Sequence, residues 1–260
     1  MIRTEAVKIT PGRQGRFSVD PLENLHSLHQ HEEEIRVKSL EVIKADTALN
    51  DHLNIISEAM NLIYVFSHDY QHQDDDELTY QLFGIRLFNA AGASIKLALS
   101  GYYQKAFDHV RDVLETYFLV DYLTTHHGKL GEWRKVDKKA RMKLFGPAVI
   151  RDALDKRDGF TSGERTKIYS LISEYALHAS YRGFSLVTNE KNLGEVGPFY
   201  DLTKLQAWVQ ELAKRLSHAA VILVHDHKGM DQVLLATRSH YLTAVNAWVA
   251  KYLGGKPLSP

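Results

Sequence analysis

The chain has no cysteine among its 260 residues. This absence excludes disulfide bonds, thiolate nucleophiles and zinc sites with sulfur ligands, and it fits a reducing cytoplasm. Net charge is also absent, because 32 Lys and Arg side chains balance 32 Asp and Glu side chains. The overall electrostatic field therefore gives no reason to expect tight, non-specific binding to nucleic acid or membranes. We expect a cytoplasmic protein.

Long hydrophobic runs are missing as well. The longest is AAVILV, from Ala219 to Val224, whereas a transmembrane helix needs about 18 apolar residues or more. The N-terminal segment MIRTEAVKITPGRQGRF contains no apolar core of the kind found in signal peptides. We expect no membrane association.

Several catalytic and metal-binding motifs are absent. The chain has no Gly-x-Ser-x-Gly, Walker, Gly-x-Gly-x-x-Gly or His-Glu-x-x-His motif, which argues against the familiar hydrolases, nucleoside triphosphatases and dehydrogenases. His68 and His72 stand one helical turn apart, a spacing that can bind a metal. A di-iron bundle needs two Glu-x-x-His elements, and only Glu23 to His26 fits. We expect neither a metal nor a cofactor.

Apolar residues recur at three- and four-residue steps through most of the chain, which is the period of amphipathic helices. The predicted helices cover 22–70 as one long or twice-broken helix, 78–100, 102–123, a restart at Pro147, 162–180 with Ser162 as N-cap, 201–225 and 232–253.

The remaining segments complete a prediction of fold class. Residues 181–200 place β-favouring side chains on both sides of an Asn/Lys/Gly turn, which predicts a loop or short hairpin. We expect an all-α multi-helix bundle in which 1–20 is a flexible arm, 21–253 a single helical domain and 254–260 a tail.

Two charged residues stand out on the helix predicted from Tyr102. On a helical wheel Arg111 and Glu115 fall within its apolar sector, so both are expected to be partly desolvated. His178, on a later predicted helix, is the best third partner by pattern. An Arg111, Glu115 and His178 cluster would be either a catalytic acid–base site or a network that braces the core.

A family resemblance rests on the same residues. The run SGYYQKAFDHVRDVLETYFLVDYL, followed by a basic segment and a helix ending SEYALHAS, resembles a group of uncharacterised helical bacterial proteins known as a domain of unknown function. The resemblance extends over about 89–224. It implies functional importance for Arg111, Glu115 and His178, but no established activity.

More distantly, the predicted helices resemble the HEPN superfamily. Its ribonuclease members use an Arg followed four to six residues later by a His, usually across a dimer. Arg215 and His218 are spaced more closely than that, and Arg111 has no His in the window. A metal-independent ribonuclease that uses Arg111 and His178 is therefore the enzymatic alternative to a helical interaction or regulatory protein, which by analogy would act in bacterial stress or phage defence.

Two further patterns predict partners. A basic strip with interleaved aromatic residues offers phosphate contacts, or else forms a solvated helix face; its main residues are Arg134, Lys138, Lys139 and Arg141. Aromatic and apolar residues near the C-terminus predict a homodimer interface; they are Trp208, Val209, Trp248 and Tyr252. RNA or another protein is the expected further partner.

Overall fold

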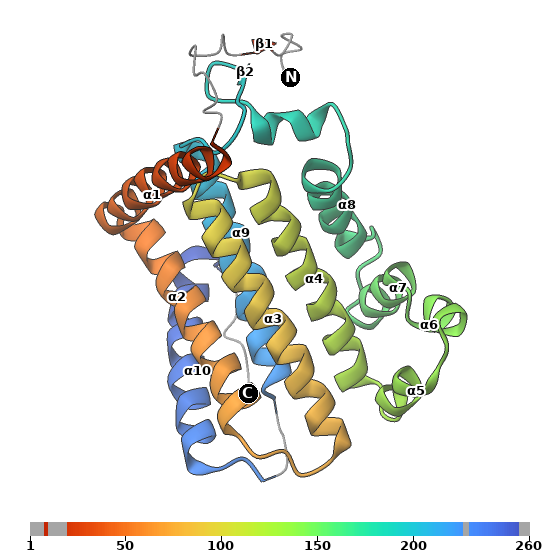
Figure 1. The fold of residues 1–260 in the computed structure, drawn as a ribbon. Coiled ribbons are helices and arrows are strands. Elements are labelled where there is room, and N and C mark those ends of the chain that lie inside the picture. The colour runs from red at the N-terminus through yellow and green to blue at the C-terminus, as the bar shows by residue number, and fades with distance from the viewer. Residues whose placement is uncertain (1–7, 10–19, 226–228, 255–260) are drawn as a thin grey trace.

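The computed structural model describes residues 8–9, 20–225 and 229–254. In these residues the chain forms ten α-helices, one π-helical segment, one 3-10 helix and a pair of two-residue strands. The predicted all-α bundle is confirmed (Figure 1). Most of the predicted arm 1–20 and of the tail 254–260 lies outside the described residues.

The elements follow one another in this order: β1 (Lys8–Ile9), α1 (Pro21–Ala45), α2 (Thr47–Tyr64), η1 (Val65–Asp69), α3 (Asp75–Leu99), α4 (Tyr103–Thr125), α5 (Lys129–Lys135), α6 (Lys138–Phe145), α7 (Pro147–Arg157), α8 (Glu164–Ala176), η2 (Arg182–Val187), β2 (Leu193–Gly194), α9 (Leu202–Leu223) and α10 (Gln232–Tyr252).

Helix α4 is the centre of the molecule. It packs against α3 and α9 on one side and against α7 and α8 on the other. Figure 1 shows the long helices α2, α3, α4, α9 and α10 side by side, with α5 to α8 as a second layer along the outer side of α4. A chain of hydrogen bonds joins three of these helices, because Trp208 Nε1 donates to Ser94 Oγ at 2.8 Å and Ser94 Oγ donates to the Ala106 carbonyl at 2.8 Å.

The helix predicted over 22–70 is broken at Asp46. The Asp46 side chain accepts hydrogen bonds from the backbone N–H groups of Ala48 and Leu49, and its own backbone is extended. An Asp in this position is a strong N-cap, so α1 ends and α2 begins here without any Gly or Pro. The end of the predicted helix is the π-helical segment η1.

The link between α3 and α4 is as short as predicted, and it depends on Gly101. This residue has φ +89°, and a Cβ added to it would lie 2.5 Å from the Phe199 carbonyl oxygen. A side chain here would be strained and would clash with backbone. The αα-hairpin therefore closes against the segment that leads into α9.

Helix α8 is shorter than the predicted 162–180. It begins after Gly163 and ends at Ala176, where the N–H groups of Leu177 and His178 both donate to the Ser173 carbonyl. Ser180 Oγ then donates to the Glu174 carbonyl at 2.8 Å. These bonds satisfy two of the last four carbonyls of the helix, and the chain turns away here.

The loop or hairpin predicted over 181–200 is partly helical. Its first part forms the 3-10 helix η2, and its second part is a tight turn closed by an antiparallel bridge between Thr188 and Gly194. Asn192 supplies the left-handed residue of that turn with φ +55°. The adjacent strand β2 pairs in parallel with β1.

The side chains that predicted a homodimer interface mostly lie in the core instead. Trp208 and Val209 are fully buried and Trp248 is nearly so, because α9 runs between α2 and α4 and Trp248 Nε1 donates to His52 Nδ1 at 2.9 Å. Tyr252 is half-buried and donates to Asp51. The predicted aromatic surface is therefore absent among these four residues.

Among the described residues, one helix is apolar enough to cross a membrane by length and composition alone. This helix is α3, and 44% of its most apolar stretch is buried inside the protein. The core helix of a globular bundle passes the same test, and α3 packs along α4.

Candidate functional site

Arg111 and Glu115 form the expected pair on α4. Arg111 Nη2 lies 3.2 Å from Glu115 Oε2, and their side chains are 19% and 38% exposed, respectively. The predicted partial desolvation is confirmed. The further partners come from α8: Arg111 Nε donates to Ser173 Oγ at 2.8 Å, and Arg111 Nη2 donates to the Tyr169 hydroxyl.

The prediction that His178 completes this cluster is wrong. His178 follows the end of α8 and is exposed, and its side chain makes no hydrogen bond or ion pair within the described part of the chain. Leu171 lies two helical turns before His178 and so on the same face of a helix, and Leu171 is 55% exposed. Tyr169 and Ser173 occupy the position given to the histidine.

The basic strip divides into three kinds of residue. Arg134 is already engaged, since it forms an ion pair with Asp76 at 2.5 Å and donates to the Asp75 carbonyl at 2.8 Å. Lys138 and Lys139 are exposed at the start of α6. Arg141 lies over the Trp133 ring at 5.5 Å and lines a cavity. Of the four predicted phosphate contacts, Arg134 is therefore committed to holding α5 against the start of α3.

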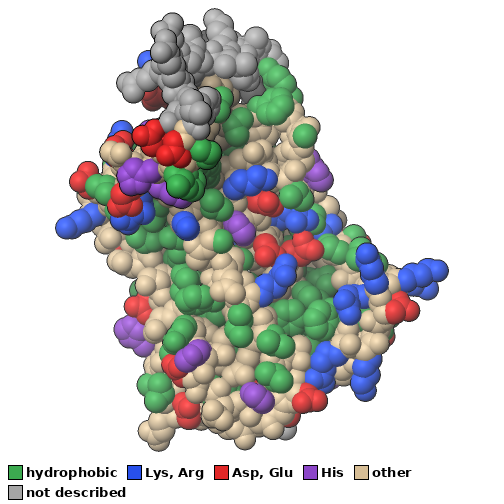
Figure 2. All heavy atoms as spheres, in the orientation of Figure 1, with side chains coloured by type: hydrophobic (Ala, Val, Ile, Leu, Met, Phe, Trp, Pro, Cys, Tyr) green, Lys and Arg blue, Asp and Glu red, His purple; other side chains and the backbone are tan. Residues whose placement is uncertain are grey.

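This cavity, which we call the arginine pocket, has a volume of about 330 Å³ and lies between α3, α4 and the layer formed by α5 to α8. Figure 2 shows hydrophobic side chains gathered between the lower part of α4 and the α5–α6 segment, with Lys and Arg side chains along the edges. The lining residues are Phe83, Arg86, Glu115, Thr116, Phe118, Leu119, Trp133, Arg141, Met142, Phe145, Pro147, Ile150, Arg151 and Tyr169.

The charges of the arginine pocket do not balance. Arg86 forms an ion pair with Asp112 at 2.5 Å, and Glu115 is held by Arg111. Arg141 and Arg151 have no carboxylate partner within the described residues. The pocket therefore presents two uncompensated guanidinium groups next to aromatic walls.

Arg151 is the unusual member of this group. The residue is 8% exposed, and its side chain has two contacts: Nε donates to Thr166 Oγ1 at 3.2 Å, and the guanidinium lies 4.0 Å from the centre of the Tyr169 ring. Its Nη1 is buried and has no hydrogen-bond partner. A buried charge without an ion-pair partner costs several kcal/mol, so this arrangement calls for an explanation.

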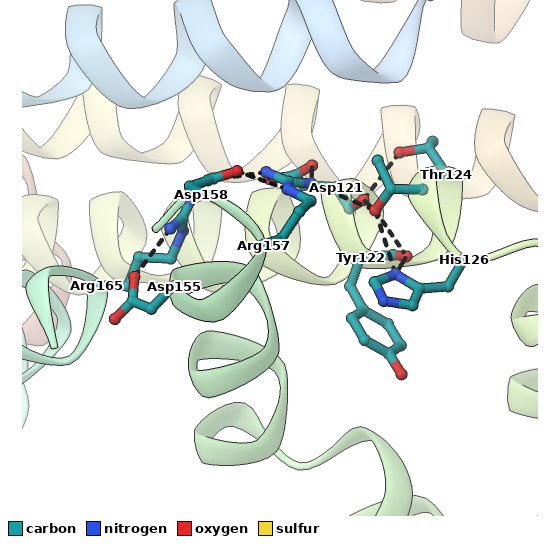
Figure 3. Close-up of polar contacts among 9 residues, drawn as sticks. Asp121, Tyr122, Thr124, His126, Asp155, Arg157, Asp158 and Arg165 are labelled. Carbon is teal, nitrogen blue, oxygen red and sulfur yellow. Dashed lines mark hydrogen bonds and ion pairs between the residues drawn. The ribbon is translucent and has the colours of Figure 1, made fainter. Parts of the chain in front are cut away.

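A clamp of ion pairs fixes α7 and α8, which carry Arg151 and Tyr169, onto α4. Arg157 at the end of α7 makes two hydrogen bonds to the buried Asp121 carboxylate, at 2.6 and 3.0 Å (Figure 3). Arg165 at the start of α8 pairs with Asp155 at 2.9 Å and also with Asp158.

The electrostatics of the clamp favour its charged form. The hydrogen bond from Arg157 lowers the pKa of Asp158 below its usual value, with a further contribution from Arg165 against the opposing effect of burial. Asp158 therefore remains ionised at neutral pH and joins the two arginines. The clamp holds one wall of the arginine pocket in place.

The opposite wall is aromatic. Phe83 of α3 and Trp133 of α5 lie with ring centres 5.1 Å apart and ring planes inclined by 47°. Met142 and Phe145 of α6 extend the apolar surface. Flat apolar groups pack well on such surfaces, and the guanidinium of Arg141 lies at their edge.

The arrangement is equipped for binding more than for proton transfer. Glu115, the one carboxylate that lines the pocket, is tied to Arg111, and Tyr169 accepts a hydrogen bond from the same guanidinium. Across residues 20–225 and 229–254, no three His, Asp or Glu side chains are grouped so that they could hold a metal ion.

Comparison with known proteins gives no relatives: no family model, curated protein or solved structure matches the chain. The resemblance to an uncharacterised helical family and to HEPN proteins therefore remains a prediction from the quoted residues.

Arg151 was not among the predicted site residues, and the sequence signal pointed away from it. Arg151 and Asp155 stand at i and i+4 on α7, a spacing that normally predicts an ion pair. In the structure Asp155 pairs with Arg165 instead. Only the fold shows that Arg151 is left without a carboxylate.

Proposed function

We propose that this protein is a non-catalytic helical binding and regulatory module, and that its arginine pocket takes up an anion that carries a flat apolar group. An aromatic carboxylate and a nucleoside monophosphate both have this chemistry. The observation that carries the proposal is the buried guanidinium of Arg151, which has a free Nη1 and no carboxylate partner in the described chain. In the bacterial stress or phage-defence setting that the family resemblance implies, such a ligand would be the signal.

The anionic half of the ligand follows from the arginines. A guanidinium presents up to five N–H donors in a planar fork that matches carboxylate and phosphate oxygens. Arg151 uses one of its donors in a hydrogen bond to Thr166, and Arg141 makes only a long hydrogen bond of 3.4 Å to the Val136 carbonyl. An anion between these two side chains would supply the missing acceptors.

The apolar half follows from the walls and the volume. Phe83, Trp133 and Phe145 surround a space of about 330 Å³, which is at the small end of the range of about 300–1,000 Å³ for ligand pockets. A compact ring system fits this space, whereas a long chain does not.

Binding is favoured over the ribonuclease alternative because the two residues on which that alternative depends do not meet within one chain. Arg111 is committed to Glu115, Tyr169 and Ser173, and His178 is exposed beyond the end of α8. A general base has to reach the proton that it removes. Within the part of one chain that the structure describes, His178 has no such contact with Arg111.

The test is isothermal titration of the wild-type protein with two pairs of ligands. Each pair joins an anion to its neutral analogue: adenosine 5′-monophosphate with adenosine, and indole-3-carboxylate with indole-3-methanol. The variants are Arg151→Met, which keeps length and removes the charge, and Arg36→Met as a matched control, because Arg36 lies on α1 and pairs with Glu33 in solvent.

We expect at least one anion to bind, its neutral analogue to bind more weakly, and Arg151→Met to lose about 1.5–3 kcal/mol of binding free energy, or roughly ten- to 150-fold in affinity. Arg36→Met should bind as wild type does. Equal binding of an anion and its neutral analogue, or normal binding by Arg151→Met, would refute the proposal. Cleavage of an RNA pool by wild type but not by folded His178→Ala would establish the ribonuclease alternative instead.

A further inference from the structure

We propose a second binding site in the cavity between α8, α9 and η2, which we call the α8–α9 chamber, and we infer that it takes an apolar molecule with a terminal carboxylate. The chamber has a volume of about 650 Å³, within the range typical of small-molecule sites. It shares no lining residue with the arginine pocket, and the inference does not depend on the function proposed above.

The body of the chamber is apolar. Phe107 of α4, Ile168 and Ile172 of α8, Leu186 of η2 and Ala207 of α9 contribute to its walls. It opens to solvent along α8, where Leu171 lines the cavity and yet is 55% exposed. A flexible hydrocarbon would replace water along these walls, and the favourable free energy of doing so is proportional to the apolar area covered.

Charged side chains line one end of the chamber, and they differ in how fully their hydrogen-bonding groups are paired. Glu211 has two cationic partners, since Lys214 Nζ donates to its Oε1 at 3.0 Å and Arg215 Nη2 donates to its Oε2 at 2.7 Å. Burial alone would raise the pKa of Glu211, but Arg215 and Lys214 bring that pKa below its usual value. Glu211 therefore remains an anion that two cations neutralise.

Arg215, by contrast, has donors to spare. Its Nε is buried without a hydrogen-bond partner, and Glu211 is its one carboxylate partner among the described residues. Lys204, which also lines the chamber, is paired with Asp201 at 2.6 Å. A cationic ligand would find Glu211 already neutralised and would be repelled by Arg215 and Lys204. A carboxylate would accept the spare donors of Arg215.

The chamber can be tested with three ten-carbon probes that differ only in the terminal group: decanoate, decanol and decylamine, each used below its aggregation limit. Binding is measured by isothermal titration to the full-length protein, and the fold of each variant is checked by circular dichroism and thermal melting. Arg215→Met removes the spare donors and leaves Glu211 its bond from Lys214. Ala207→Phe fills the chamber and leaves its charges in place. Arg36→Met is the matched control, because Arg36 pairs with Glu33 in solvent and lines neither cavity.

We expect decanoate to bind at least tenfold more tightly than decanol, and decylamine to bind least. Arg215→Met should reduce decanoate to the affinity of decanol, Ala207→Phe should abolish binding of both, and Arg36→Met should change neither. Equal binding of decanoate and decanol would overturn the assignment of a carboxylate. An absence of decanoate binding, a preference for decylamine, or full binding by folded Ala207→Phe would overturn the site itself.

Discussion

Replacing Arg151 with Met should weaken ligand binding while leaving the free energy of unfolding of the empty protein nearly unchanged. Arg151 and Arg165 form a natural comparison, because both are 8% exposed and both lie over aromatic rings. They differ in their partners: Arg165 pairs with Asp155 and Asp158, whereas Arg151 donates to one hydroxyl, that of Thr166. If Arg151 is kept for a ligand, then its removal should cost the empty protein little.

The magnitude follows from the contacts. The Met variant loses a hydrogen bond from a charged donor to Thr166, about 1.5–3 kcal/mol, and a cation–π contact with Tyr169, about 0.5–2 kcal/mol. It also relieves the desolvation of an unpaired buried charge, which is several kcal/mol. We expect these losses and this gain to offset each other, so that the free energy of unfolding falls by no more than about 1 kcal/mol. In a chain of this size that corresponds to a fall in Tm of about 2–4 °C.

The matched variant Arg165→Met should behave differently. It strands the buried Asp155 and leaves Asp158 with Arg157 as its partner, and breaking a buried pair in this way costs about 3–5 kcal/mol. Urea unfolding and thermal melting of both variants without ligand give the comparison, and titration with the ligand pairs described above gives the binding. A loss of more than about 3 kcal/mol in Arg151→Met, with unchanged ligand affinity in the folded protein, would refute the reasoning and make Arg151 a structural residue.

Two further predictions concern the clamp and the buried histidine. Asp121→Asn should weaken the two hydrogen bonds from Arg157 and reduce the free energy of unfolding, measured with urea, by an amount near the lower end of about 3–5 kcal/mol. It should also weaken anion binding in the arginine pocket, measured by titration. Unaltered ligand affinity would mean that the clamp does not position α7. Burial lowers the pKa of His52 below its ordinary value of 6.5, so the unfolded chain binds a proton near that pH before the folded protein does, and the free energy of unfolding should fall as the pH drops below 6.5. Urea unfolding between pH 7.5 and 5.5 should show this decline in wild type and a flatter profile in His52→Gln; parallel profiles would contradict it.

The fold was largely predictable because the apolar period of three to four residues is a local property that tertiary packing seldom reverses. The boundaries that were missed depend on side chains acting as caps. Asp46 ends one helix and starts the next with its own carboxylate, and Ser180 folds back onto the Glu174 carbonyl beyond the end of α8. Such caps move a boundary by a few residues, and four residues were enough to take His178 out of its predicted helix.

The site was predictable only in part. Arg111 and Glu115 lie one turn apart on the same helix, so their pairing can be expected from sequence, and the structure places both beside the arginine pocket through Tyr169. Tyr169 could have been found as a residue on the apolar side of α8. The cavity itself requires α3, α5 and α7 to meet, and no local pattern encodes that meeting.

An unpaired charge is a stronger sign of a binding site than a paired one, and it is also harder to see in a sequence. Arg111 attracts attention because its partner is close in the chain, but that partner satisfies it, and a satisfied pair can hold two helices together without any ligand. Arg151 escapes attention because Asp155 stands at the right spacing to satisfy it. The fold gives Asp155 to Arg165 and leaves Arg151 buried with an open donor beside a cavity. The cost of that burial makes the arginine pocket the first place to look for a ligand.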